Sequence, residues 1–189
     1  MKRLALSALG LVLLAAGAAR ADEITRAGPA ASPIATSVTV PSGYDTVYVS
    51  GLTPPVADAK AAPGTVAAYG DTKTQAMGVF NRLSEALKAQ GMGLGDVVMM
   101  RVYLAGDPAK DGKMDFAGMM GAYTTFFGTP AQPNKPARVT VQVASLVGPG
   151  MLCEIEVQAA RKHMAATAHA VKHAKPATAP AAPAPAKTK

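Results

Sequence analysis

Three residue types are scarce in this 189-residue chain, which has no tryptophan, one cysteine, and three histidines that all follow residue 162. Aromatic residues make up 5% of the sequence, so the basic and aromatic surface that stacks on single-stranded nucleic acid is missing. The single Cys153 has no second cysteine for an internal disulfide. Residues 22–161 contain no histidine, which excludes Ser-His-Asp and Cys-His catalysis there and disfavours a His-ligated zinc site. We therefore expect no metal site.

The positive charge of the chain belongs to its two ends. The formal net charge is +7, but three Lys and Arg fall in residues 1–21 and five lysines fall in residues 162–189, where no acid occurs. Residues 22–161 hold 11 basic residues against 12 acidic ones, which gives this part a net charge of −1. Because a basic surface is not a property of the central part, we expect no nucleic-acid partner.

The N-terminus has the pattern of a cleavable secretory signal. A basic pair at residues 2–3 precedes an apolar run over residues 4–16, and the small residues Ala19 and Ala21 stand at the −3 and −1 positions of a cleavage site. The run is shorter than the ~20 residues that span a bilayer. We expect a signal peptide over residues 1–21, cleavage after Ala21, and a periplasmic or secreted protein. An uncleaved membrane anchor is the alternative.

Composition divides the remaining chain into three parts. Residues 22–37 are rich in Ala, Pro, Gly and Ser without an apolar period, which predicts a flexible linker. Residues 162–189 consist mainly of Ala, Pro, Lys and His, and such a tail buries too little apolar surface to offset chain entropy. Its extended cationic arm predicts a weak, salt-sensitive contact with an anionic cell envelope, with a purely solubilising tail as the alternative. Residues 38–161 remain as one compact domain.

Hydrophobic periodicity within this domain predicts an α+β fold with the order β-β-α-β-α-β-β. We expect strands over residues 37–40, 46–50, 97–104, 137–146 and 151–159, and helices over residues 71–91 and 116–127. Each helix has one apolar face, so we expect one mixed sheet that carries both helices on one side. The Gly148-Pro149-Gly150 turn predicts that the last two strands pair as an antiparallel hairpin.

Alternation along these last two strands predicts which side chains share a face. On the first strand, Val139 and Val141 point away from Arg138, and on the second strand Glu154 and Glu156 point away from the apolar side. We therefore expect Arg138 to share a face with the two glutamates, on the side that the helices leave open. An arginine fork binds a carboxylate at two places, and a glutamate orients or deprotonates a water. That face is either solvated or covered by another subunit.

Several short motifs occur in order between about residue 47 and residue 160. They are Gly95-Asp96-Val97-Val98, Asp115-Phe116 followed by Tyr123 and Phe126-Phe127-Gly128, Pro136-Ala137-Arg138, and Glu154-Ile155-Glu156. Together they resemble the RidA family, also called YjgF-like. The resemblance implies a chorismate-mutase-like α+β fold and a homotrimer with ligand clefts between subunits. It also implies hydrolysis of enamines and imines such as 2-aminoacrylate to 2-keto acids and ammonia, without a metal or organic cofactor.

The resemblance assigns roles by position. It implies that Arg138 binds the carboxylate of a small-molecule substrate and that Glu154 holds the hydrolytic water. Ser50 and Gly51 match a pair that lines the same cleft, and Thr140 stands on the Arg138 strand where many members have cysteine. Arg138 and Glu154 are therefore the candidate catalytic residues, and Ser50, Gly51 and Thr140 are candidate substrate contacts.

Other roles for these residues stay open. Arg138 can also serve as a solvated strand residue or as an ion pair between subunits, and Glu156 offers the same chemistry as Glu154. The Gly-Pro-Tyr that usually precedes the first strands of the family has no counterpart, and Met120 stands where many members have asparagine. A non-catalytic periplasmic trimer that binds small carboxylates or protects other proteins is the alternative function.

Overall fold

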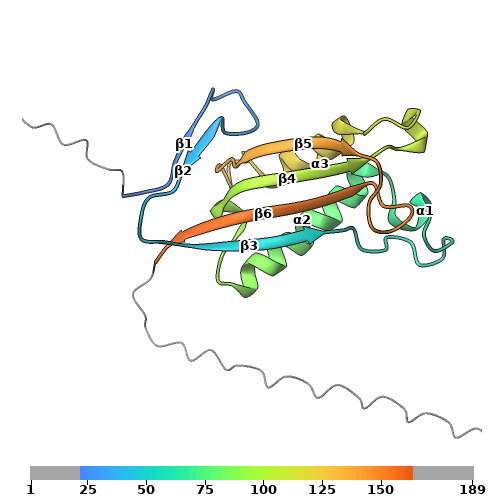
Figure 1. The fold of residues 1–189 in the computed structure, drawn as a ribbon, viewed down its shortest axis with the longest axis horizontal. Helices are drawn as coiled ribbons and strands as arrows, with labels where there is room; N and C mark the ends of the chain where they lie inside the picture. The colour runs from blue at the N-terminus through green and yellow to red at the C-terminus, as the bar shows by residue number, and fades with distance from the viewer. Residues whose placement is uncertain (1–21, 164–189) are drawn as a thin grey trace, which may run out of the picture.

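One mixed sheet with helices on one face forms the body of the protein (Figure 1). The computed structural model describes residues 22–163. The sheet has four strands in the order β3-β6-β4-β5. They are β3 (Tyr44–Leu52), β4 (Val97–Ala105), β5 (Ala137–Val143) and β6 (Cys153–Lys162), and the main helices are α2 (Thr72–Ala89) and α3 (Phe116–Phe126). The expected signal peptide and residues 164–189 of the expected tail lie outside the described residues.

Smaller elements complete the fold. A two-stranded antiparallel sheet precedes the body, and a short helix and two 3-10 turns lie in the connections. They are β1 (Thr25–Ala27), β2 (Ser37–Thr39), α1 (Val66–Tyr69), η1 (Leu94–Asp96) and η2 (Pro108–Lys110). No helix within residues 22–163 is long and apolar enough to cross a bilayer. In the same range, no group of three or more His, Cys, Asp or Glu side chains is arranged to hold a metal ion.

Both main helices begin where the sequence predicts. The Asp71 side chain accepts a hydrogen bond from the Thr74 backbone N–H at 2.8 Å, and this bond holds the pKa of the Asp71 carboxyl below its usual value. The Asp115 side chain accepts from the Gly118 N–H at 3.0 Å in the same way. After α2 the chain reverses at Gly91, whose φ of 69° favours glycine. The caps fix where each helix begins, and the apolar stripe of each helix sets which face meets the sheet.

The core lies between these helices and one face of the sheet, which we call the covered face; the other is the open face. The Tyr123 ring stacks on Phe127 at 4.9 Å and lies 6.2 Å from Phe80. The fully buried Ile155 and Cys153 of β6 point into the same core. Each buried large apolar side chain contributes about 1.5–3 kcal/mol. The expected α+β sheet with both helices on one face is therefore confirmed.

The expected hairpin of the last two strands is wrong. β6 lies between β3 and β4 and runs antiparallel to both, whereas β5 runs parallel to β4 at the sheet edge. A parallel neighbour requires a crossover connection, and α3 supplies it between β4 and β5. The Gly-Pro-Gly turn therefore returns the chain to the middle of the sheet. The central place also gives both backbone edges of β6 a hydrogen-bonding partner.

The expected linker is also different in the structure, because residues 22–39 pack on the domain; we call them the N-terminal strap. β1 pairs with β2, and the Ala35 N–H donates to the Pro136 carbonyl at 3.0 Å. Backbone and polar contacts hold much of this segment. Such contacts leave no periodic pattern of apolar residues, so the sequence did not predict that the segment packs on the domain. At the other end, β6 continues to Lys162 and the His163 N–H donates to the Gly43 carbonyl at 2.8 Å. The tail therefore begins later than residue 162, and one histidine belongs to the domain.

Candidate functional site

Arg138 lies on the covered face of the sheet. It is the second residue of β5, and the register places it opposite Met100 of β4, which in turn lies opposite Val157 of β6. Paired residues share a face, and both of these neighbours are buried in the core. The expectation that Arg138 shares a face with Glu154 and Glu156 is therefore wrong. Alternation along β5 was predicted correctly, but its valines face outward and its polar residues face the helices.

The Arg138 guanidinium lies in a setting without carboxylates. Its Cζ atom lies 4.4 Å from the ring centroid of Tyr123 and 5.9 Å from that of Phe116, and Nη2 lies 3.2 Å from the thioether sulfur of Met120. Burial lowers the pKa of Arg138 from its usual value. Nη1 is buried and has no hydrogen-bond partner among residues 22–163. A cation held against aromatic faces is attracted by them, but its N–H groups still need acceptors.

Thr140, two residues further along β5, is a second residue with a buried polar atom that has no hydrogen-bond partner in residues 22–163. It lies on the same face of β5 as Arg138, and its hydroxyl oxygen is also buried without a partner within the described part of the chain. A buried polar group that is left without a hydrogen bond costs about 1–3 kcal/mol. Two such groups on one face of an edge strand form a small set of donors without acceptors. A ligand carboxylate would supply the missing oxygens.

Glu154 lies elsewhere, on the open face at the start of β6. The register places it opposite Tyr103, and a Cβ atom at Gly51 would overlap its carboxylate. Gly51 and the exposed Ser50 lie at a register shift near the end of β3. The structure therefore places Glu154 against Gly51, the chain neighbour of Ser50, and places Arg138 and Thr140 on one face of β5. It does not bring the two groups together, because they lie on opposite faces of one sheet.

The open face also has an ion pair of its own. Arg101 Nη1 lies 3.1 Å from Glu156 Oε1, and the Tyr103 hydroxyl donates to the same oxygen at 3.0 Å. This hydrogen bond raises the pKa of Tyr103. The Glu156 carboxylate is thus already engaged, whereas the Glu154 carboxylate takes part in no hydrogen bond or ion pair within residues 22–163. Of the two glutamates, Glu154 has the carboxylate that is free to hold a water.

One contact near Arg138 was not predicted. The Tyr123 hydroxyl donates to the Pro33 carbonyl of the strap at 3.0 Å. Tyr123 is fully buried, and burial raises its pKa to about 12. The helical periodicity of the sequence identified this residue only as part of an apolar stripe. Its hydrogen bond joins residues 90 positions apart, which no local pattern reveals.

Comparison with known proteins identifies the family to which the chain belongs. The sequence profile of the family described as Endoribonuclease L-PSP matches residues 29–161. A RutC family protein from Pyrococcus horikoshii is 40% identical over 87 residues, which are 46% of this chain and 60% of that protein. The matched stretch therefore spans less than two thirds of that relative.

Two solved structures are similar to this chain. A protein of the conserved Rid family from Yersinia pestis is 23% identical, with a TM-score of 0.53 over 72% of this chain and 97% of that one. The YjgF gene product of E. coli is 28% identical, with a TM-score of 0.48 over 65% and 84% of the two chains. The first of these likenesses identifies the fold. With the profile match over residues 29–161, we conclude that the chain belongs to the Endoribonuclease L-PSP family, which is the RidA or YjgF family that its motifs resemble.

Proposed function

We propose that this protein hydrolyses enamines and imines that carry a carboxylate, of the 2-aminoacrylate type, to 2-keto acids and ammonia. The observation that carries the proposal is the buried, partnerless Nη1 of Arg138, together with the partnerless hydroxyl of Thr140 two residues along the same face of β5. A substrate carboxylate satisfies both groups and forms two charge-assisted hydrogen bonds with the arginine fork. Tyr123 and Met120 lie against the same guanidinium and offer it no oxygen that would compete with the substrate carboxylate.

The proposed reaction uses side chains and water alone. The enamine takes a proton from water at its terminal carbon, loses one from its nitrogen and becomes an imine, while Arg138 holds the carboxylate. Water adds to the imine carbon, and Glu154 acts as general base that takes a proton from the water and passes it to the imine nitrogen. The resulting carbinolamine gives its hydroxyl proton through Glu154 to the leaving nitrogen, so that ammonia departs and the C=O bond of the 2-keto acid forms. One water is consumed for each ammonia released.

This scheme needs two subunits. Within one chain Arg138 lies on the covered face at the β5 edge, whereas Glu154 lies on the open face beside β3, the opposite edge strand. We propose a homotrimer in which Arg138 of one subunit and Glu154 of its neighbour meet at the same substrate. Val139 and Val141 support this, because they leave 41% and 40% of their surface exposed on the open face. Light scattering at micromolar concentration tests the assembly, and a monomer would contradict it.

The carboxylate site is tested by Arg138→Lys with Arg101→Lys as the matched control. Lysine keeps the positive charge but loses the planar fork, so we expect the affinity for 2-ketobutyrate to fall about tenfold or more. Arg101 faces the other side of the sheet and is paired with Glu156, so its variant should bind as the wild type does. Calorimetric titration measures both. Equal affinity of Arg138→Lys and the wild type would contradict the site.

Hydrolysis is tested separately from binding. An imino acid is generated in situ by an amino-acid oxidase, and ammonia release is compared with the spontaneous rate. We expect Glu154→Gln to lose the acceleration while it keeps 2-ketobutyrate affinity. If the wild type binds 2-ketobutyrate but gives no acceleration, the protein is a non-catalytic binder of small carboxylates. The separation of Glu154 from Arg138 within one chain is the observation that favours this second candidate.

Charge distribution favours a small anion over RNA, although the family description names an endoribonuclease. Residues 22–161 carry 11 basic and 12 acidic residues, so they offer a polyanion no excess of positive charge.

We further propose that the protein acts outside the cytoplasm, because residues 1–21 have the pattern of a secretory signal. Fractionation of cells that express the full chain tests this location.

A further inference from the structure

We propose that Tyr123 is a positioning residue that fixes the plane of the Arg138 guanidinium, and that the N-terminal strap fixes Tyr123 through the Pro33 carbonyl. The inference rests on the proposed function, in which Arg138 binds the substrate carboxylate. It adds a role for the strap, which no part of the proposed reaction uses. Three sets of contacts link the strap to the guanidinium: Arg138 to Tyr123, Tyr123 to Pro33, and the strap to the rest of the domain.

The first contact is the stacking of Arg138 on Tyr123. The guanidinium carbon lies 4.4 Å from the ring centroid, and the ring itself packs nearly parallel to Phe127, at 4.9 Å and 11°. A guanidinium held against a ring face keeps its donors in a fixed plane. Among the described residues, no carboxylate forms an ion pair with Arg138 that could hold it instead. The ring of Tyr123 therefore takes the place that a counter-ion would have.

The second contact fixes the ring. Its hydroxyl donates to the Pro33 carbonyl at 3.0 Å, and Tyr123 is fully buried, so no solvent can replace this acceptor. Because burial raises the pKa of Tyr123 to about 12, the hydroxyl keeps its proton at neutral pH and always donates. A swing of the ring about the Cα–Cβ bond, away from Arg138, would leave the hydroxyl without a partner. Pro33 thereby fixes the position of the ring, and the stack on Phe127 fixes the plane on which the guanidinium rests.

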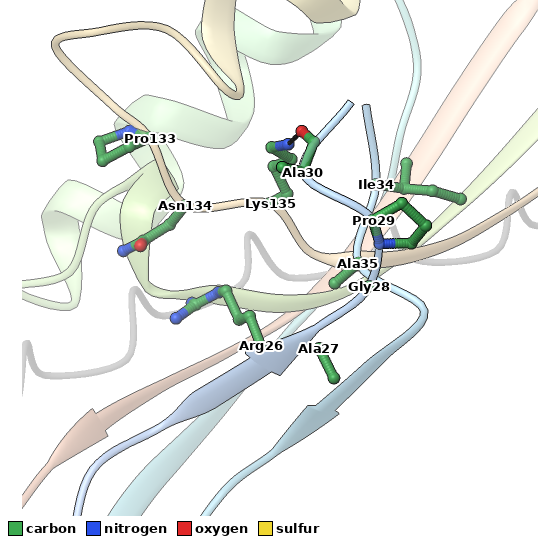
Figure 2. A pocket seen from close by; sticks show the side chains of 10 residues that line it. All are labelled: Arg26, Ala27, Gly28, Pro29, Ala30, Ile34, Ala35, Pro133, Asn134 and Lys135. Atoms are coloured by element: carbon green, nitrogen blue, oxygen red, sulfur yellow. Dashed lines mark hydrogen bonds between the residues drawn. The ribbon is translucent and has the colours of Figure 1, made fainter. Parts of the chain in front are cut away.

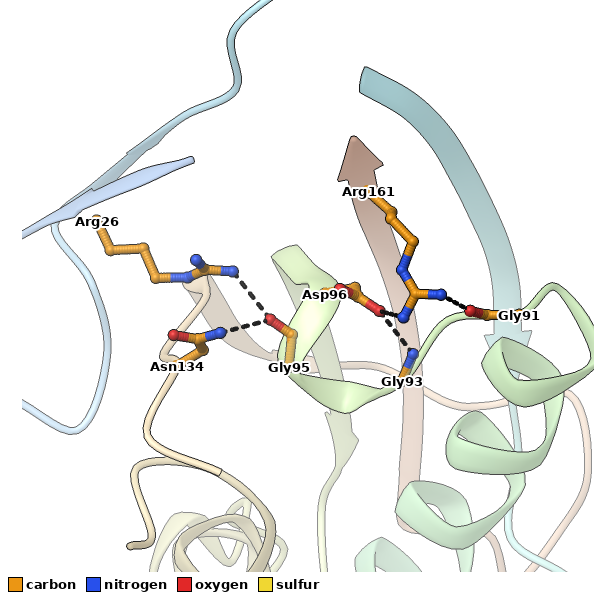
Figure 3. Close-up of polar contacts among 7 residues, drawn as sticks. All are labelled: Arg26, Gly91, Gly93, Gly95, Asp96, Asn134 and Arg161. Atoms are coloured by element: carbon orange, nitrogen blue, oxygen red, sulfur yellow. Dashed lines mark hydrogen bonds and ion pairs between the residues drawn. The ribbon is translucent and has the colours of Figure 1, made fainter. Parts of the chain in front are cut away.

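The third set of contacts holds the strap, and it is mostly polar. Arg26 donates to the Gly95 carbonyl at 3.1 Å, and Asn134 donates to the same oxygen at 3.0 Å (Figure 3). Lys135 donates to the carbonyls of Ala30 and Ser32 at 2.8 and 2.7 Å. Both lysine contacts lie within three residues of Pro33. They hold its carbonyl close to the start of β5.

A pocket lies beside these polar anchors. It has a volume of about 250 Å³ and lies between the strap and residues 133–135, with Arg26 and Lys135 in its walls (Figure 2). At its edge Ala35 is buried and Ile34 packs against the core. The hydrogen bonds from Arg26 and Lys135 add to this packing and hold the strap on both sides of the pocket. Arg138 orientation then depends on a segment that lies more than 100 residues earlier in the chain.

The direct test compares Tyr123→Phe with Tyr44→Phe. Both variants remove one tyrosine hydroxyl that donates to a strap carbonyl, because Tyr44 donates to the Asp22 carbonyl at 3.3 Å. Of these two tyrosines, Tyr123 contacts Arg138 and Tyr44 does not. NMR of the ligand-free protein follows the Arg138 Nε–H signal and its exchange with water. We expect exchange to be about three- to tenfold faster in Tyr123→Phe and unchanged in Tyr44→Phe.

Ligand binding gives a second measurement. We expect the dissociation constant for 2-ketobutyrate to rise about three- to tenfold in Tyr123→Phe, and KM to rise with little change in kcat, because the ring acts on binding geometry. Tyr44→Phe should match the wild type in both. Circular dichroism checks that both variants keep the wild-type fold. A purely structural role of Tyr123 would lower the unfolding midpoint without changing the Arg138 signal.

The outcomes separate the two proposals. If wild-type protein does not bind 2-ketobutyrate, the proposed function fails, but the Arg138 signal in ligand-free protein still decides the positioning role. If Arg138→Lys loses binding while Tyr123→Phe keeps both its affinity and its Arg138 exchange rate, the positioning role is overturned and the carboxylate site stands. Equal changes in Tyr123→Phe and Tyr44→Phe would also overturn it, because they would reflect general loosening of the strap.

Discussion

Two arginines on neighbouring strands face opposite sides of the same sheet and have opposite surroundings. Arg101 of β4 is partly exposed on the open face and pairs with Glu156 at 3.1 Å. Arg138 of β5 is more buried on the covered face, where it meets Tyr123 and Met120 and no acid of the described chain. A buried charge without a counter-ion is the costlier arrangement. If stability alone had placed these residues, the carboxylate would lie beside Arg138.

The contrast separates structural from functional arginines. An ion pair at a half-exposed site contributes little, about 0–1 kcal/mol, and Arg101 with Glu156 fits this description. Arg138 instead keeps buried donors free, and stability is commonly given up in this way where a site must bind a ligand. The two faces therefore have different tasks: the covered face holds the carboxylate donors, and the open face holds Glu154 and the apolar surface for a partner subunit.

The largest effect that we expect concerns access to the covered face. Cys153 is fully buried there, and burial raises its pKa to about 12. At ~pH 8 such a thiol is about a thousandfold less ionised than a free cysteine with a pKa of ~8.5, so Ellman's reagent should label native protein at least about a thousandfold more slowly than unfolded protein. Labelling in guanidinium chloride is the control. Fast labelling of native protein would mean that the covered face opens readily, and the contrast between the faces would fail.

The next prediction compares the two arginines by stability. We expect Arg138→Met to stay within about 1 kcal/mol of the wild type, because the desolvation of a guanidinium is relieved while the side chain still fills the space near Tyr123. Arg101→Met should lower the free energy of unfolding by about 0.5 kcal/mol, since a partly exposed pair is lost. Denaturation by urea measures both. A loss above about 2 kcal/mol in Arg138→Met would show that its guanidinium serves the fold.

Local features of the fold could be predicted from the sequence. The apolar stripes over residues 71–91 and 116–127 placed α2 and α3 within a few residues. These signals depend on neighbours three and four positions apart, which a sequence displays directly. The order of short motifs also identified the family, and with it the α+β sheet.

Non-local features could not be predicted. The insertion of β6 between β3 and β4 depends on pairing across the whole domain, and the nearby turn at Gly148 suggested a hairpin instead. Alternation along β5 divided Arg138 from Val139 correctly, but two faces are equivalent until a register to β4 is known. The valines indicated the core, whereas at this edge strand they lie on the open face. The strap was missed because its anchors are polar and distant in sequence.

The smallest effect that we expect concerns Tyr103 on the open face. Its surroundings differ from those of Tyr123 on the covered face, as those of Arg101 differ from those of Arg138. Burial raises the pKa of Tyr123, whereas on the open face the hydrogen bond to Glu156 is the main cause that raises the pKa of Tyr103 above 10.0. We expect Glu156→Gln to return the Tyr103 pKa toward 10.0, because a neutral amide accepts more weakly and adds no negative charge. Glu154→Gln is the matched control, since the charge of Glu154 has the smallest effect of those that change the Tyr103 pKa.

Ultraviolet titration of tyrosinate, taken as the difference from Tyr103→Phe, measures this shift. A pKa that is raised in the folded state stabilises the fold fully below the ordinary value of 10.0, and this stability is lost as the pH rises through the raised value. Wild-type protein should therefore lose stability above that pH, and Glu156→Gln should lose less. If Glu154→Gln shifts the Tyr103 titration as far as Glu156→Gln does, the Tyr103 hydroxyl is not committed to Glu156. The open face would then lack the fixed ion-pair network that distinguishes it from the face that holds Arg138.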